Sequence, residues 1–122
     1  MAKVLVVDDA AFARLSIRKM LEANDHSVAG EASNGIEAVE KFVEVRPDVV
    51  LLDISMPEMN GLEALKRIKI IEPNARIIIC SALGQQATFA QAIEYGAVNF
   101  IVKPFSTEQL IDVIEQTMSL RQ

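Results

Sequence analysis

Short runs of apolar, mostly β-branched residues recur along this chain, and longer segments of mixed character separate them. Most of these runs contain no alternating polar positions, a pattern that is typical of strands buried on both faces of a parallel sheet. We therefore predict five short strands, at residues 4–7, 28–31, 49–52, 76–80 and 98–102.

The segments between and after these runs place apolar side chains three or four residues apart, which is the spacing of one face of a helix. The positions with this spacing are Phe12, Leu15, Ile17, Met20 and Leu21, then Ile36, Val39, Phe42 and Val43, then Leu62, Leu65 and Ile68, and finally Leu110, Val113, Ile114 and Met118. A further helix is predicted over residues 85–95, where the periodicity is weakest because the segment is rich in Ala and Gln. Asn34 is a candidate cap for the second helix, and Ser106 or Thr107 for the fifth.

The resulting order is a strand followed by a helix, five times over. Such alternation with short connections favours parallel strands joined by right-handed crossovers. We therefore predict an α/β fold with a five-stranded, doubly wound parallel sheet. No linker, low-complexity tract or internal repeat is evident, so we expect a single domain over residues 1–122 with no output domain attached.

Composition and charge argue against several classes of function. The chain of 122 residues has a net charge of −5, whereas binding to nucleic acid relies on basic patches. No apolar run approaches the roughly 20 residues that span a membrane, and the first run is too short for a signal peptide. The single cysteine, Cys80, is predicted to be a small buried hydrophobe in a reducing, cytoplasmic setting. The lone histidine, His26, is interpreted as a surface loop residue.

Chemically active side chains follow four of the predicted strands. Asp8 and Asp9 follow the first, Asp53 the third, Ser81 the fourth and Lys103 the fifth. Because open α/β sheets bind ligands at the carboxyl ends of their strands, we expect these side chains to lie at one edge. Each of them alone has an ordinary explanation as a turn or loop residue. Their conjunction is what indicates a functional site.

Three clustered carboxylates repel one another unless a cation compensates for their charge. Their oxygen atoms suit Mg²⁺, which takes one or two carboxylates and keeps its other positions for water and phosphate oxygens. A carboxylate beside such an ion can also attack phosphorus and form an aspartyl phosphate. The lysine and the hydroxyl would then hold the oxygens of the phosphoryl group.

The residues at these positions resemble the bacterial response-regulator receiver domain, in particular its stand-alone chemotaxis members. The resemblance covers nearly the whole chain, and it is carried by residues 5–9 (LVVDD), 51–61 (LLDISMPEMNG), 80–82 (CSA) and 100–105 (FIVKPF). Residues 8–12 and 81–86 look closest to the chemotaxis members. The resemblance implies a flavodoxin-like sheet with the strand order 2-1-3-4-5.

The resemblance also implies roles for the acidic residues. Asp53 would be the phosphoryl acceptor and one of the ligands of Mg²⁺. Asp9 would bind the ion directly, Asp8 mostly through water, and Ser55 through its backbone carbonyl. The remaining site residues would act on the phosphoryl group: Lys103 would contact its oxygens and Ser81 would move toward it. Phe100 would be the aromatic residue whose rotamer follows Ser81.

Two of these positions depart from the common family pattern. Ser81 stands where many relatives have Thr, so the hydroxyl is kept and a methyl group is lost. Phe100 stands where chemotaxis members often have Tyr, so it keeps the ring but cannot donate a hydrogen bond.

The function implied is a phosphorylation-activated switch that is not an enzyme, beyond promoting its own phosphoryl transfer and dephosphorylation. A histidine kinase would donate the phosphoryl group, and the readout surface would be the fourth helix, fifth strand and fifth helix. The output would be a separate protein, with a flagellar motor switch protein as first choice, and a phosphatase is a possible further partner. Neither nucleic acid nor membrane is expected to bind.

Other functions remain open at this point. The chain could be a stand-alone receiver in another phosphorelay. An aspartyl-phosphate phosphatase would carry a second carboxylate two residues after the nucleophile, where this chain has Ser55. A flavin-binding module would have a phosphate loop rich in Ser, Thr and Gly after the first strand, where Asp8 and Asp9 would repel a phosphate.

Overall fold

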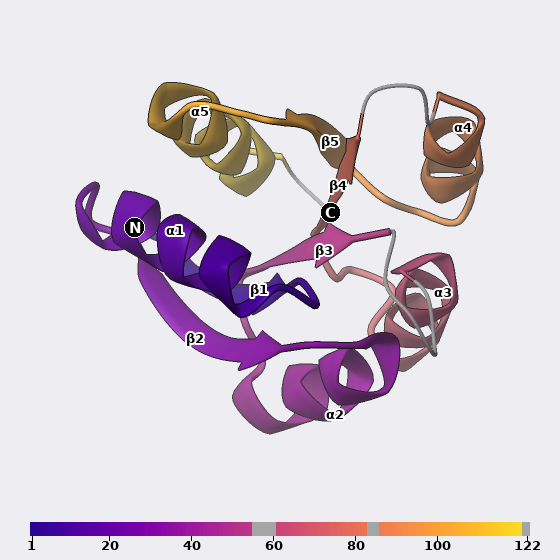
Figure 1. Cartoon of the computed structure of the whole chain (residues 1–122). Coiled ribbons are helices and arrows are strands. Elements are labelled where there is room, and N and C mark those ends of the chain that lie inside the picture. The colour runs from indigo at the N-terminus through magenta and orange to yellow at the C-terminus, as the bar shows by residue number, and fades with distance from the viewer. Residues whose placement is uncertain (55–60, 83–85, 121–122) are drawn as a thin grey trace.

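A computed structural model describes residues 1–54, 61–82 and 86–120 of the chain. Within these residues, strands and helices alternate from end to end (Figure 1). The elements are β1 (Lys3–Val7), α1 (Ala11–Glu22), β2 (Ser27–Ala32), α2 (Gly35–Val45), β3 (Val49–Asp53), α3 (Gly61–Ile71), β4 (Ile77–Ala82), α4 (Gln86–Glu94), β5 (Asn99–Lys103) and α5 (Thr107–Met118). The predicted alternation of five strands with five helices is confirmed.

The strands form one parallel sheet with the order β2-β1-β3-β4-β5, as the family resemblance implied. The register aligns the carboxyl ends of the central strands, because Val7 pairs with Leu52 and Asp53 pairs with Cys80. On the far side of β4, Ser81 pairs with Val102. The chain therefore brings the ends of four strands to a single edge of the sheet.

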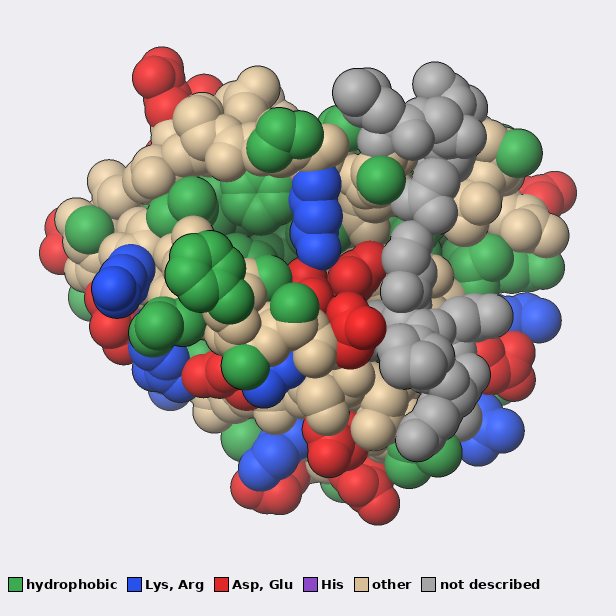
Figure 2. Space-filling view, viewed as in Figure 1, with side chains coloured by type: hydrophobic (Ala, Val, Ile, Leu, Met, Phe, Trp, Pro, Cys, Tyr) green, Lys and Arg blue, Asp and Glu red, His purple; other side chains and the backbone are tan. Residues whose placement is uncertain are grey.

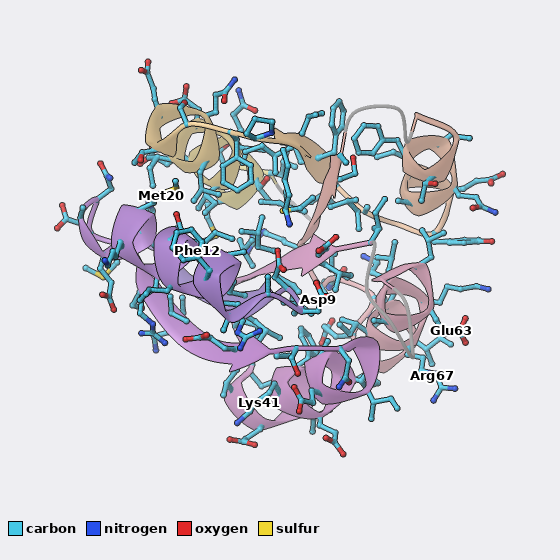
Figure 3. All side chains as sticks on the ribbon, in the orientation of Figure 1. Asp9, Phe12, Met20, Lys41, Glu63 and Arg67 are labelled. Atoms are coloured by element: carbon cyan, nitrogen blue, oxygen red, sulfur yellow. The ribbon has the colours of Figure 1, made fainter. Side chains whose placement is uncertain are left out.

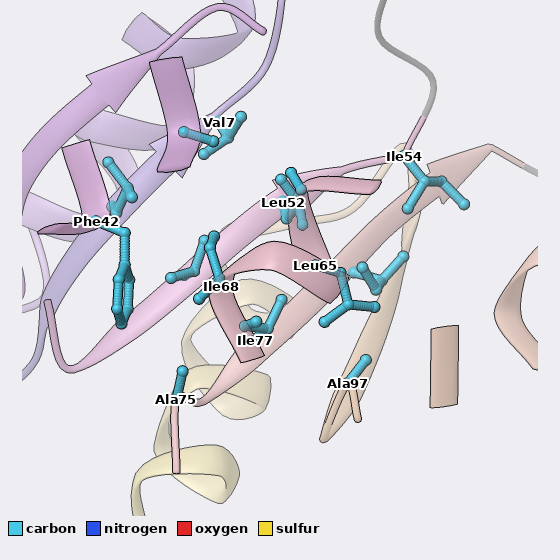
Figure 4. Packing of buried hydrophobic residues seen from close by; sticks show 14 of the residues in the cluster. Val7, Phe42, Leu52, Ile54, Leu65, Ile68, Ala75, Ile77 and Ala97 are labelled. Atoms are coloured by element: carbon cyan, nitrogen blue, oxygen red, sulfur yellow. The ribbon is translucent and has the colours of Figure 1, made fainter. Parts of the chain in front are cut away.

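Alternating residues of each central strand point to opposite faces of the sheet, and both faces are buried under helices. Helices α2, α3 and α4 cover one face, and α1 and α5 cover the other (Figure 1). Figure 4 shows Leu52 of β3 packed with Leu65 and Ile68 of α3 in the first of these layers. Fully burying one such aliphatic side chain contributes about 1.5–3 kcal/mol, so the sheet edge rests on a rigid core.

Two predicted helix caps are confirmed. The Asn34 side chain accepts a hydrogen bond from the Glu37 backbone N–H at 2.8 Å. Of the two candidates for α5, Ser106 is the cap: its hydroxyl accepts from the Gln109 N–H, and the Gln109 side chain accepts from the Ser106 N–H. Reciprocal bonds of this kind satisfy two backbone donors that a helix start leaves without partners.

The helical spacing overestimated the buried face of α1 and α2. Ile17, Leu21 and Phe42 are buried as predicted, whereas Phe12 is 82% exposed. The other exposed members of the predicted faces are Leu15, Ile36 and Val43. A helix on a sheet buries only a stripe about 100° wide, and apolar residues at its margins remain in contact with solvent.

The interpretation of His26 as a surface residue is wrong. Its side chain is buried, and its Nδ1 accepts a hydrogen bond from the Ala2 N–H at 2.9 Å. Its Nε2 lies 3.6 Å from a carboxylate oxygen of Glu115 on α5. The imidazole therefore joins the chain start to the last helix, a long-range contact that local sequence does not reveal.

Cys80 is buried as predicted, and burial raises the pKa of its thiol. Among the described residues, no helix is both long enough and apolar enough to cross a membrane.

Candidate functional site

Three carboxylates meet at the carboxyl edge of the sheet. Asp8 and Asp9 follow β1, and Asp53 is the last residue of the neighbouring strand β3. One carboxylate oxygen from each of these residues lies within 4.8 Å of the other two. Asp8 and Asp53 are buried and Asp9 is exposed, so the cluster is open on one side. Figure 3 labels Asp9 in the loop between β1 and α1, and Figure 2 shows acidic side chains gathered on this face.

Lys103, the last residue of β5, brings a positive charge to the cluster. Its Nζ lies 2.6 Å from Asp8 Oδ2 and 3.4 Å from Asp53 Oδ2. Partial burial would lower the pKa of Lys103, but the hydrogen bond to Asp8 and the charges of Asp53 and Asp8 outweigh it and raise this pKa. The side chain therefore stays an ammonium ion at neutral pH and is available to hold an anion.

Ser81 lies near the end of β4 with its side chain buried. Among the described residues, its hydroxyl is one of the few buried side-chain groups without a hydrogen-bond partner. A buried polar group without a partner costs about 1–3 kcal/mol, which makes this hydroxyl ready to bind an incoming ligand atom. Ser81 lies one residue beyond Cys80, which pairs with Asp53, so its hydroxyl is at the same edge of the sheet as the acidic residues.

Phe100 lies on β5 at a half-exposed position, away from the core layers. Its ring centroid is 4.5 Å from that of Phe89 on α4, with the ring planes at 41°. Tilted pairs of this kind are favourable contacts between aromatic rings. Phe100 therefore joins β5 to α4 at the surface. Phe105 is a partly buried aromatic residue that packs against the core layer of α1 and α5.

The structure places Asp8, Asp9, Asp53 and Lys103 together, as the sequence predicted. Ser55, expected to supply a backbone carbonyl, lies outside the described residues.

Sequence reasoning missed two features beside the site. Arg14 of α1 donates a hydrogen bond from Nη1 to the Asp8 carbonyl at 2.5 Å and pairs with Glu31 of β2. Glu31 is the one charged residue of strand β2, and this was the signal that could have revealed the contact.

The second feature is a largely apolar groove of about 460 Å³, which is lined by Lys103, Phe12, Met20 and Phe105 among others. Figure 3 shows Phe12 and Met20 along the same helix, α1.

The donor set of the cluster fits Mg²⁺. Carboxylate oxygens are the hard ligands that this ion prefers, and the open side leaves room for water or a phosphate oxygen. Lys103 offsets only part of the negative charge of three carboxylates, so a divalent cation would complete the compensation.

Comparison with known proteins assigns the fold and this edge of the sheet to a family. The family described as response regulator receiver domain matches residues 4–115. The chain belongs to this family. Receiver domains bind Mg²⁺ at an acidic pocket of this kind, and those similar to CheY lack a conventional catalytic activity of their own.

Relatives from several bacteria are similar over almost their full length. The chain is 52% identical to the chemotaxis protein CheY of Thermotoga maritima over 114 residues, which cover 93% of this chain and 95% of that protein. It is 50% identical to CheY of Bacillus subtilis over 117 residues, covering 96% and 98%. These similarities support the function of a phosphorylation-activated signalling switch in chemotaxis.

A solved structure has the same fold. The crystal structure of a CheX-CheY-BeF3-Mg complex from Borrelia burgdorferi contains a chain with a TM-score of 0.92 and 32% sequence identity to this one. The match covers 97% of this chain and 90% of that chain.

Proposed function

We propose that Asp53 is the residue that accepts the phosphoryl group, and that a histidine kinase supplies it. The observation that carries the proposal is the buried carboxylate at the end of β3, within 4.8 Å of Asp8 and Asp9 and 3.4 Å from Lys103. In the reaction, a carboxylate oxygen of Asp53 forms a bond to phosphorus while the phosphorus–nitrogen bond of the phosphohistidine breaks. The released imidazole keeps the electron pair and takes up a proton.

In this proposal Mg²⁺ is held by Asp8, Asp9, Asp53 and the backbone carbonyl of Ser55, which lies outside the described residues. When bound, the ion would offset the negative charge of the carboxylates and of the phosphoryl oxygens. The support for this assignment is the convergence of three carboxylate oxygens on one open cluster.

Lys103 is proposed to hold the transferred group. Its ammonium now hydrogen-bonds Asp8 and lies farther from Asp53. Phosphoryl oxygens on Asp53 would offer a second charged partner, and hydrogen bonds between charged groups are about twice as strong as neutral ones. The ammonium can turn from Asp8 toward the phosphoryl group while the lysine backbone stays in β5.

Ser81 and Phe100 are proposed to convert phosphorylation into a change of surface. The buried Ser81 hydroxyl, which lacks a partner among the described residues, can donate a hydrogen bond to a phosphoryl oxygen. Movement of Ser81 would open space that the Phe100 ring can enter, and its contact with Phe89 would then change. The surface of α4, β5 and α5 would therefore report the state of Asp53 to a partner.

The wider role follows from the same proposal. Residues 1–122 would act as one receiver domain in the cytoplasm, without binding nucleic acid or membrane and without a separate substrate to turn over. The output would be a separate protein, with a flagellar motor switch protein as first choice, and a phosphatase would reset the switch. A receiver in another phosphorelay is the alternative, and copurification of partners with the phosphorylated protein distinguishes the two.

The test is transfer of a phosphoryl group from acetyl phosphate with Mg²⁺, followed by intact-mass measurement. The parent protein should gain one phosphoryl group, and Asp53→Asn should gain none because an amide is a poor nucleophile toward phosphorus. The control is Asp112→Asn, which changes an exposed carboxylate on α5 and should leave labelling unchanged. Full labelling of Asp53→Asn would show that another residue is the acceptor.

A further inference from the structure

Arg14 joins the loop that carries the acidic residues to a neighbouring strand. Its Nη1 donates to the backbone carbonyl of Asp8 at 2.5 Å, and its Nε donates to Glu31 Oε1 at 3.0 Å. The Arg14 side chain is only 18% exposed, so these contacts are partly shielded from water. One guanidinium group thus connects the β1–α1 loop to the adjacent strand β2, near its carboxyl end.

The far end of this connection is itself held in place. Glu31 also accepts hydrogen bonds from Arg18 Nε and Nη2 at its other carboxylate oxygen. The hydrogen bonds from Arg18 and Arg14 lower the pKa of Glu31, although burial opposes them, so the carboxylate is charged at neutral pH. Arg14 therefore bonds to a charged anchor that Arg18, one turn farther along α1, also holds.

The other contacts of Asp8 explain what the Arg14 bond adds. The Asp8 N–H donates to the Ala32 carbonyl at 3.0 Å, and the Asp8 carboxylate accepts from the Ala10 N–H at 2.9 Å. The Asp8 carbonyl belongs to the planar peptide unit that joins Asp8 to Asp9. Holding this oxygen therefore fixes the orientation of the backbone from which the exposed Asp9 side chain leaves.

We propose that Arg14 is a positioning residue of the metal site, which holds the Asp8–Asp9 peptide so that both carboxylates face Asp53. This inference rests on the proposed function, because it assumes that Mg²⁺ binds at the acidic cluster. Arg14 acts through the backbone and touches neither the ion nor the phosphoryl group.

The direction in which Mg²⁺ affinity changes when Arg14 is replaced distinguishes a positioning role from an effect of its charge. A cation near the cluster repels Mg²⁺, so loss of its charge alone would strengthen Mg²⁺ binding. Loss of positioning would weaken it, and changing a group that orients metal ligands typically costs 10–100-fold in affinity. A lower affinity after removal of a positive charge therefore cannot come from electrostatic attraction.

The experiment is a titration of the unphosphorylated protein with MgCl₂, followed by calorimetry or by backbone amide chemical shifts. Arg14→Gln should bind Mg²⁺ about tenfold more weakly than the parent. Arg14→Lys should behave like Arg14→Gln, because an ammonium restores the charge but lacks the planar fork that reaches two acceptors. The matched control is Arg18→Gln, which also loses bonds to Glu31 but has no described contact with Asp8, and its affinity should stay within twofold of the parent.

Stability is measured in parallel by urea unfolding without Mg²⁺. A purely structural role predicts that Arg14→Gln and Arg18→Gln lose stability without a specific change in Mg²⁺ affinity. If Arg14→Gln is too unstable to titrate, Arg14→Lys replaces it, because the charge is then unchanged and a roughly tenfold loss of Mg²⁺ affinity reflects lost positioning.

Unchanged or tighter Mg²⁺ binding in Arg14→Gln would overturn the positioning role. Parent-like binding by Arg14→Lys would overturn it too, because charge would then be sufficient. Failure of the parent protein to bind Mg²⁺ would overturn the metal site and this inference together. Mg²⁺ binding without labelling of Asp53 would contradict the proposed function alone.

Discussion

Gly61, the first residue of α3, lies against the backbone of the proposed phosphoacceptor. A Cβ atom at this position would be 2.5 Å from both the Asp53 carbonyl oxygen and Ile54 Cα. Backbone atoms cannot turn aside as a flexible side chain can, so α3 or the end of β3 would have to shift. Gly61→Ala should therefore lower the free energy of unfolding by about 1–3 kcal/mol and slow phosphorylation of Asp53 by acetyl phosphate.

Gly30 in β2 offers the matched control for this prediction. A Cβ atom there would meet Leu5 Cδ1 at 3.5 Å, an ordinary van der Waals contact. Urea unfolding and labelling rates of Gly30→Ala should therefore stay close to those of the parent. Equal stability losses in the two glycine variants would show that the close approach at Gly61 relaxes without consequence.

Strand ends made the acidic site predictable from sequence. Asp53 and Lys103 each end an apolar run, and parallel strands bring their carboxyl ends to one edge. The placement of Asp8, Asp9, Asp53 and Lys103 was thus contained in local patterns together with one rule of topology. The proposal that Asp53 is the phosphoacceptor came from the family resemblance, because three carboxylates in a cluster do not by themselves distinguish nucleophile from metal ligand.

Contacts between elements that are distant in sequence were not predictable in the same way. Arg14 meets Glu31 across 17 positions, and His26 meets Ala2 and Glu115. None of these three contacts leaves a periodic signal, since each depends on how distant elements pack after the sheet has formed. The exposure of Phe12 was not predicted either, because helical spacing shows which face of a helix is apolar but not how wide the buried part of that face is.

The start of α5 can be tested through its capping box. The Ser106 hydroxyl accepts from the Gln109 N–H at 3.1 Å, and the Gln109 side chain accepts from the Ser106 N–H at 2.8 Å. Ser106→Ala removes the first bond and should cost about 1 kcal/mol of unfolding free energy, measured with urea. Ser106→Thr keeps a hydroxyl and should recover most of the loss. A Ser106→Ala protein as stable as the parent would indicate that water satisfies the free N–H equally well.

At the scale of the whole molecule, the sheet separates a rigid support from a responsive edge. Both faces carry buried aliphatic layers, and the polar groups with functional potential lie where the strands end. The Ser81 hydroxyl lies near the end of β4, and the Phe89–Phe100 pair joins α4 to β5. In the proposed function, a small rearrangement at Asp53 would change the surface of α4 and β5 without repacking the core, as a reversible switch requires.

The charged groups of the molecule define the pH range in which the fold is most stable. The pKa of Glu31 is lowered by its hydrogen bonds with Arg18 and Arg14, and that of Glu37 by the Ser33 N–H. The stability that these carboxylates contribute is fully present above their ordinary value of 4.5 and is lost as the pH falls through their lowered pKa values. Lys103 has the opposite pH dependence, because its pKa is raised. The stability that its ammonium contributes is fully present below the ordinary pKa of 10.5 and is lost as the pH rises through the raised pKa.

The unfolding free energy should therefore be nearly constant around neutral pH and fall on acidification below about pH 4.5. Glu31→Gln cannot lose a charge there, so its stability should fall less steeply with pH than that of the parent. One proton taken up on unfolding changes the slope by at most about 1.4 kcal/mol per pH unit, which urea unfolding at a series of pH values can resolve. Glu40→Gln, which changes an exposed carboxylate on α2, is the control and should keep the slope of the parent. If Glu31→Gln and the parent lost stability in parallel between pH 5 and pH 3, the network of Arg14, Arg18 and Glu31 would not contribute to the stability of the fold.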